Sequence, residues 1–153
     1  MLAELALGLF GFTGVAATFG GRDRSYSILD KVRMEGIFIL ASSVMLGSLA
    51  VLTVSASASS SAMAFGWASL IAATVLCRAA YTSLTSSIPL ARDPELSSSL
   101  FVALVALAII WSCFLIHVAN FALWRSALPL LLAFSLQLAW ALFLFARFLT
   151  QRN

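Results

Sequence analysis

The chain has 153 residues, of which 62% are hydrophobic and only 10% are charged, and its mean hydropathy is +1.05. Because a soluble domain carries roughly 25% charged residues, this composition argues against a water-soluble globular protein and predicts an integral membrane protein. The net charge of +3 is expected to orient the chain against a bilayer, and we expect no nucleic-acid partner. Residues 1–153 should form one transmembrane domain, with no separate soluble domain.

Five apolar stretches predict an all-α, polytopic transmembrane bundle, since about 20 helical residues cross the ~30 Å hydrocarbon core. The predicted spans cover residues 2–20, 35–54, 62–84, 95–123 and 126–149. The last two are divided only at Trp124-Arg125-Ser126, where Ser126 can cap a new helix and Pro129 fits its first turn. If that division is absent the count falls to four, which is the alternative.

The first span contains glycines at three-residue spacing: Gly8, Gly11 and Gly14. Small residues on one helix face let two helices approach closely, so this stripe predicts a helix-packing surface. Gly20-Gly21 is expected to end the helix. Positive charge follows this apolar run rather than preceding it, the reverse of a secretory signal, so the segment is interpreted as a retained helix.

The charged block over residues 20–35 separates the first two spans. Its Ser27-Ile28-Leu29-Asp30 sequence has the form of a capping box, so the second helix is expected to begin before the membrane. Two prolines mark later boundaries. Pro89 is expected to break the third helix, and Pro94 lies between two acids in a pattern typical of a helix start.

Orientation follows from the basic residues, which accumulate in cytoplasmic loops. With five spans, most of them fall on one side of the membrane: Arg22, Arg24, Lys31, Arg33, Arg92, Arg147 and Arg152, with Arg78 leaning toward the same side. Arg125 alone falls on the other side. The expected topology places the N-terminus outside and the C-terminus in the cytoplasm.

Arg78 is the most conspicuous polar residue, because it lies inside the third span and buried arginine is costly. One interpretation is that its guanidinium snorkels to the headgroups. The other pairs it with acids predicted on the same inner face, as a structural clamp or as part of an anion-attracting vestibule. Those candidate partners are Asp30, Glu35, Asp93 and Glu95.

A second polar group is predicted on the fourth span, where Cys113, His117 and Asn120 share one helix face. Glu4 and Arg125 are expected on the same outer side, so a pocket of Glu4, His117, Asn120 and Arg125 is one interpretation. The other is that these groups form hydrogen bonds between helices, as we also expect for Gln137 and for Ser42 or Ser43.

Cofactor and catalytic patterns are not found. Cys113 and His117 give two ligands where a structural zinc site needs four, and the chain has one histidine, so we expect no metal site and no cofactor. Nucleotide-binding loops and zinc-protease helices do not occur, and no acid is predicted beside His117 except Glu4. The two cysteines, Cys77 and Cys113, fall at different depths and are expected to be free thiols.

The stretch from Gly11 to Gly21-Arg22, followed by Asp30-Lys31-Val32-Arg33, resembles the opening of certain small multi-pass bacterial membrane proteins of unassigned function. The resemblance covers about a fifth of the chain. It implies a bacterial inner-membrane location and no particular activity.

These observations lead to two functional hypotheses. The first is a non-catalytic helical bundle that acts through contacts with the lipid bilayer and with other chains, as a homo-oligomer or as an accessory subunit of a membrane assembly. The alternative is a small oligomeric channel or transporter for ions or small solutes, lined by the outer polar residues and by Arg78.

Overall fold

The computed structural model describes residues 4, 7, 8, 11, 14, 28–57, 60–91 and 97–150. The regular structure of these residues is helical, in agreement with the predicted all-α class. The long elements are α2 (Ile28–Ala56), α3 (Ser61–Ala91), α4 (Ser97–Ala119) and α5 (Ala127–Thr150), and a short π-helix, η2 (Asn120–Trp124), continues α4.

Four helices among the described residues are long and apolar enough to span a membrane. The stretches that meet this criterion are Arg33–Ala56, Ser61–Thr82, Leu104–Trp124 and Ala127–Arg147. The first predicted span, over residues 2–20, falls almost wholly outside the described residues, so the described structure supports four spans and not five. The last two predicted spans are separate helices.

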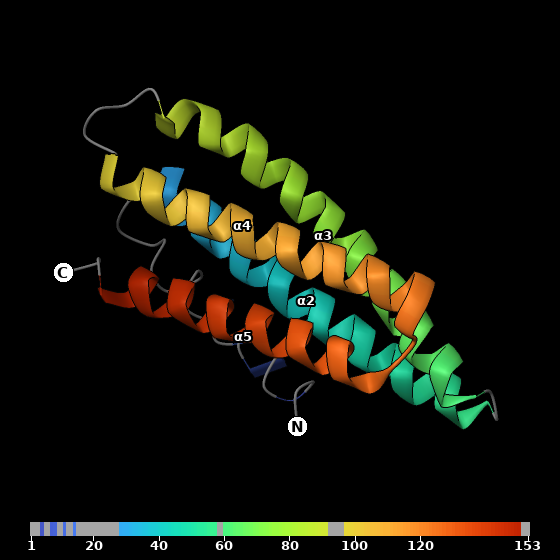
Figure 1. Cartoon of the computed structure of the whole chain (residues 1–153). Coiled ribbons are helices and arrows are strands. Elements are labelled where there is room, and N and C mark those ends of the chain that lie inside the picture. Colours follow the sequence, from blue (N-terminus) through green and yellow to red (C-terminus); the bar gives the residue numbers. More distant parts are fainter. Residues whose placement is uncertain are drawn as a thin grey trace.

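The four long helices run alternately up and down as a bundle (Figure 1). Helices α2 and α4 each pack against both α3 and α5, so consecutive helices are neighbours and α5 closes the bundle on α2. The connection from α2 to α3 and the turn from α4 to α5 lie at one end of the bundle. The beginning of α2 and the end of α5 lie at the other end.

Small side chains let the helices of the bundle approach closely. Alanines on three helices are fully or almost fully buried, including Ala41, Ala64, Ala68, Ala72, Ala133 and Ala141. Larger residues fill the space between them, with Ile37, Leu40 and Leu76 no more than 1% exposed. Lipid is as apolar as leucine, so close packing of this kind is what holds transmembrane helices together.

One helix boundary agrees with the sequence-based expectation and one differs from it. Helix α2 begins at Ile28, well before the predicted span and as its capping pattern indicated. Helix α3 continues through Pro89 to Ala91, so the predicted break at that proline is wrong. Because Pro89 lies only two residues from the helix end, its missing N–H removes a single hydrogen bond from the last turn, and the helix tolerates it there.

The division between the last two helices occurs at Arg125 and Ser126, where the sequence predicted it. The π-helix η2 ends when Arg125 adopts a left-handed conformation with φ 47° and ψ 45°. Its backbone N–H donates to the Asn120 carbonyl oxygen at 2.7 Å. Pro129 then falls in the first turn of α5, where its missing N–H is harmless.

Candidate functional site

A hydrogen-bonded chain of three buried side chains crosses the bundle from α2 through α5 to α4. The Ser43 hydroxyl donates to Gln137 Oε1 at 2.7 Å, and Gln137 Nε2 lies 2.8 Å from His117 Nε2. An amide nitrogen can only donate, so Gln137 Nε2 donates this bond and His117 Nε2 accepts it. All three side chains are 0% exposed. We call Ser43, Gln137 and His117 the polar chain.

Phe134 covers the polar chain on its apolar side. Its ring centroid lies 5.3 Å from that of His117, with the rings tilted by 52°. The far end of the same phenyl ring reaches α2 at Gly47, where an added Cβ would lie 2.4 Å from Phe134 Cζ. The absence of a side chain at Gly47 therefore makes room for Phe134, which packs against the polar chain at His117.

A second buried group, the Asn120 cluster, consists of Ser69, Asn120 and Ser126. Asn120 Nδ2 donates to the Ser69 hydroxyl on α3 at 2.8 Å, and Asn120 Oδ1 accepts from the Ser126 backbone N–H at 3.0 Å. Asn120 and Ser69 are both 0% exposed. One amide therefore joins α3 to the turn that leads into α5.

The predicted outer pocket of Glu4, His117, Asn120 and Arg125 is not assembled as one site. His117 and Asn120 belong to separate buried groups, and each is hydrogen-bonded to a different helix. Arg125 is exposed, and its Nε donates to the Phe121 carbonyl oxygen at 3.1 Å. Glu4 is exposed as well. His117 and Asn120 thus follow the other interpretation, in which they form hydrogen bonds between helices.

Arg78 and its predicted acidic partners are not brought together by the described residues. The Arg78 side chain is exposed on α3, as is that of Glu35 on α2, and no ion pair joins the two. Asp93 and Glu95 lie outside the described residues, and so does the Asp30 side chain. The exposed position of Arg78 is the one expected for a guanidinium directed toward headgroups or toward another chain.

The predicted glycine stripe makes no close helix contact with the described part of the chain. A Cβ added at Gly8, Gly11 or Gly14 would have no described atom within 4 Å. Close approach occurs instead at Gly47, as described above, and at Gly36, where an added Cβ would lie 3.3 Å from Leu144 Cδ1. Both of these glycines lie on α2.

Both cysteines are free, as predicted, with Cys77 exposed and Cys113 buried. The Cys113 thiol points toward the Ala133 carbonyl oxygen of α5 at 3.8 Å, a weak contact between helices. A search of the described residues finds no group of three or more His, Cys, Asp and Glu side chains that could hold a metal ion.

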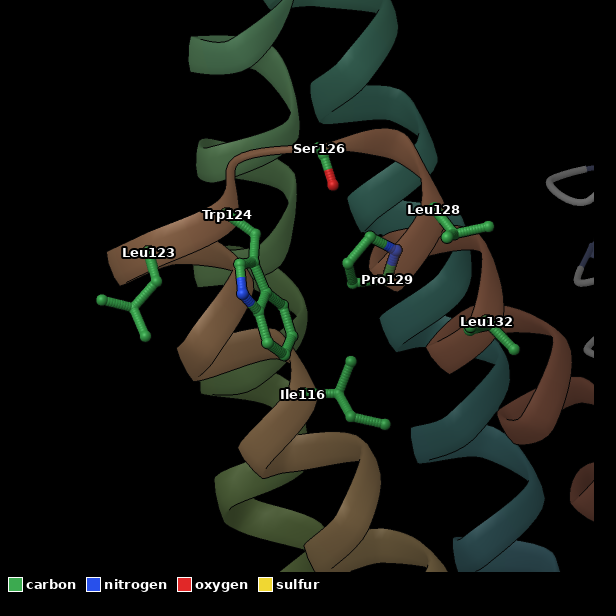
Figure 2. A pocket seen from close by; sticks show the side chains of 7 residues that line it. All are labelled: Ile116, Leu123, Trp124, Ser126, Leu128, Pro129 and Leu132. Carbon is green, nitrogen blue, oxygen red and sulfur yellow. The ribbon is translucent and has the colours of Figure 1, made fainter.

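An open groove of about 630 Å³ lies beside the α4–α5 turn (Figure 2). Its lining is apolar except for one hydroxyl and one indole N–H. The lining residues are Ile116, Leu123, Trp124, Ser126, Leu128, Pro129 and Leu132. In Figure 2 the Trp124 indole hangs from the turn toward Ile116, and Pro129 faces it from α5.

Two of the residues that make these contacts, Ser69 and Gly47, are not among the candidates expected from the sequence. Ser69 resembles the other serines of the chain, and nothing in its neighbourhood distinguishes it as the partner of Asn120. Gly47 is an isolated glycine within an apolar helix, which costs about 1 kcal/mol relative to alanine and so indicates a packing requirement. That signal could have directed attention to Gly47 rather than to the N-terminal stripe.

The described residues form an all-helical bundle with four helices of membrane-spanning length, and two groups of buried polar side chains are hydrogen-bonded between its helices. Comparison with protein-family models, with curated proteins and with solved structures finds no match.

Proposed function

We propose that this protein is a non-catalytic integral membrane bundle that acts through contacts with other chains, either as a homo-oligomer or as an accessory subunit of a membrane assembly. The observation that carries the proposal is the position of Arg78. Its side chain is exposed within Ser61–Thr82, a stretch of α3 that is long and apolar enough to cross a membrane.

An arginine on the outer surface of such a helix requires a counter-charge, water or lipid headgroups within reach of its side chain, because an unpaired cation in hydrocarbon is unfavourable. Residues 36–92 contain no acid, so α3 itself cannot supply one. Cys77 and Tyr81 beside it are exposed too, Tyr81 by 70%. This surface of α3 therefore has the chemistry of a contact with a partner chain that carries an acidic or other acceptor group.

The alternative, a water-filled path through one bundle, has less support. Such a path needs polar groups that face a solvated cavity. His117, Asn120 and Gln137 are each 0% exposed, and each is hydrogen-bonded to a side chain of another helix. These polar groups serve to join the helices, which favours a bundle that acts through its outer surface.

The proposal includes a fifth span over residues 2–20, an inner-membrane location, an outside N-terminus and a cytoplasmic C-terminus. The distribution of basic residues supports the proposed orientation. Helix α2 begins and α5 ends at the same end of the bundle, which gathers Lys31, Arg33 and Arg147 there, while Arg125 lies at the opposite end. Basic residues favour the cytoplasmic side, so the α4–α5 turn should face outward.

The assembly proposal predicts that the wild-type chain, extracted in mild detergent, migrates as a complex with itself or with other membrane proteins. Arg78→Leu should reduce the complexed fraction roughly tenfold or more, since removing one partner of a buried charge contact has effects of this size. Native mass spectrometry measures the fraction. Arg125→Leu, the same change at the other end of the bundle, is the matched control and should leave it unchanged.

Two results would contradict the assembly proposal. One is a wild-type chain that carries no bound protein under these conditions. The other is an equal loss of complex in the Arg78→Leu and Arg125→Leu variants, which would mean that positive charge in general, rather than the α3 surface, holds the assembly together.

The topology proposal is tested by labelling cysteines introduced at Ser60, in the α2–α3 connection, and at Thr150, at the end of α5. A membrane-impermeant maleimide applied to intact cells should label Ser60→Cys and leave Thr150→Cys unlabelled until the cells are opened. The unsubstituted chain measures the background from Cys77 and Cys113. The reverse pattern would overturn the proposed orientation.

A further inference from the structure

We propose that a second copy of this chain docks on the α2–α3 side of the bundle, with Arg78 of each copy paired to Glu35 of the other. This inference rests on the proposed function and names its partner, because it makes the assembly a homodimer. Three observations support it. They are the polar outer face of α3, the matching depths of the two charges, and the complementarity that a two-fold axis gives them.

The second half of α3 has an unusually polar outer face. Between residues 72 and 85, every side chain described as exposed carries a hydroxyl, a thiol or a charge: Thr74, Cys77, Arg78, Tyr81 and Thr85. On α5, by contrast, the exposed side chains are apolar except for Ser135 and the terminal Thr150. Small and polar residues are typical of the surfaces at which transmembrane helices associate, so α3 has the character of a protein contact and α5 that of a lipid contact.

Glu35 lies at nearly the same depth as Arg78. Its side chain is exposed on α2, the helix that precedes α3 and packs against it. Both helices meet at the connection between Ala56 and Ser61. Glu35 lies about 21 residues from that connection and Arg78 about 17, so at ~1.5 Å per residue their Cα atoms differ in depth by only ~6 Å. Extended glutamate and arginine side chains can bridge such a difference.

A two-fold axis perpendicular to the membrane makes the two charges complementary between copies. In such a dimer, a contact of Arg78 with Glu35 across the axis implies a second, identical contact on the other side of it. The axis also keeps both copies in one orientation, so each residue stays at its own depth. Within one copy, neither side chain has an ion-pair partner among the described residues. A second copy therefore supplies both counter-charges, whereas a different partner chain would need an acid and a base of its own at this depth.

The test uses full-length copies that carry two different affinity tags, extracted in mild detergent and analysed by native mass spectrometry. Arg78→Glu and Glu35→Arg, each expressed alone, place like charges at both contacts and should lower the dimer fraction about tenfold or more. When the two variants are coexpressed, each contact of the mixed dimer again joins opposite charges, so the mixed dimer should form as the wild type does. Arg125→Glu, a charge reversal at the other end of the bundle, is the matched control and should leave the dimer fraction unchanged.

A milder variant separates loss of the contact from loss of the fold. Glu35→Gln removes the carboxylate without reversing its charge and should lower the dimer fraction in the same direction, while circular dichroism shows its helices retained. A dimer fraction that Glu35→Gln leaves unchanged would overturn the assignment of Glu35.

Three further results would overturn the homodimer, and they bear differently on the proposed function. A self-associated wild type with no rescue in the coexpressed variants would mean that other residues form the contact, and the assembly proposal would stand. Complexes that hold one copy of this chain with another membrane protein would identify an accessory subunit instead. A wild type that carries no bound protein would contradict both the homodimer and the proposed function.

Discussion

Replacing Gly47 by alanine is expected to lower the free energy of unfolding by about 1–3 kcal/mol, the usual effect of overpacking a helix interface. The added Cβ would lie 2.4 Å from Phe134 Cζ and 3.1 Å from Cε1 of the same ring. Phe134 is 2% exposed and lies against His117, so it has little room to turn aside. The backbone oxygen of Ala68, at 3.4 Å, limits movement of α2 in another direction.

The measurement is an SDS titration of the protein in mixed micelles, followed by circular dichroism. Gly66→Ala is the matched control, because its added Cβ would meet only Arg125 and Phe121 at 3.7 Å or more. That variant should be as stable as the wild type or more stable, by up to about 1 kcal/mol, since alanine is the better helix former. Helix propensity favours alanine over glycine at both Gly47 and Gly66. Only the Phe134 ring beside Gly47 is therefore expected to make the two substitutions differ.

Shortening the ring should relieve the clash. Phe134→Leu alone leaves a cavity and destabilises the bundle. In the double variant Gly47→Ala/Phe134→Leu, the alanine methyl occupies part of that space, so the combined loss should be smaller than the sum of the two single losses. Strictly additive losses would show that Gly47 and Phe134 are not in the contact described.

The helices could be predicted from the sequence because hydropathy over about 20 residues is a local property. This is why the starts of α3 and α5 and the turn at Arg125 fall close to their predicted positions. Pro89 shows the limit of local rules. A proline is strongly unfavourable in the middle of a helix, but its penalty depends on how many helical turns follow the proline. Helix α3 ends at Ala91, only two residues after Pro89.

The pairing of the polar groups could be predicted only in part. Cys113, His117 and Asn120 share a buried face, as their spacing indicated, and Gln137 bonds across helices as expected. Their partners depend on the register between helices that are distant in sequence, which no local pattern encodes. For the same reason the sequence left two interpretations open, one outer pocket or hydrogen bonds between helices, and the structure shows the second, with His117 and Asn120 in two separate groups.

These two groups pair most of the buried polar side-chain atoms of the described bundle, and His117 Nδ1 and Trp140 Nε1 are the buried ones left without a partner there. An unpaired amide or imidazole in an apolar interior is unfavourable, and a polar partner on a facing helix removes that penalty. The polar chain joins α2, α5 and α4, and the Asn120 cluster joins α3 to the α4–α5 turn. Every long helix of the described bundle is therefore held by at least one buried side-chain bond.

Gln137→Leu is the second change expected to have a large effect, because Gln137 is the central member of the polar chain. Leucine fills a similar volume but removes both the acceptor for Ser43 and the donor to His117. The hydroxyl and the imidazole would then be buried without partners, at an expected loss of about 1–3 kcal/mol in the free energy of unfolding. The same SDS titration measures this loss.

Two comparisons show whether the loss comes from unpaired groups or from altered shape. Ser43→Ala removes one end of the chain and leaves the Gln137–His117 bond intact, so it should be less destabilising than Gln137→Leu. The triple variant Ser43→Ala/His117→Phe/Gln137→Leu removes every polar member and should regain much of the stability, since no donor or acceptor of the polar chain is left unpaired. A triple variant less stable than Gln137→Leu would mean that the polar chain stabilises the bundle through its shape rather than through its hydrogen bonds.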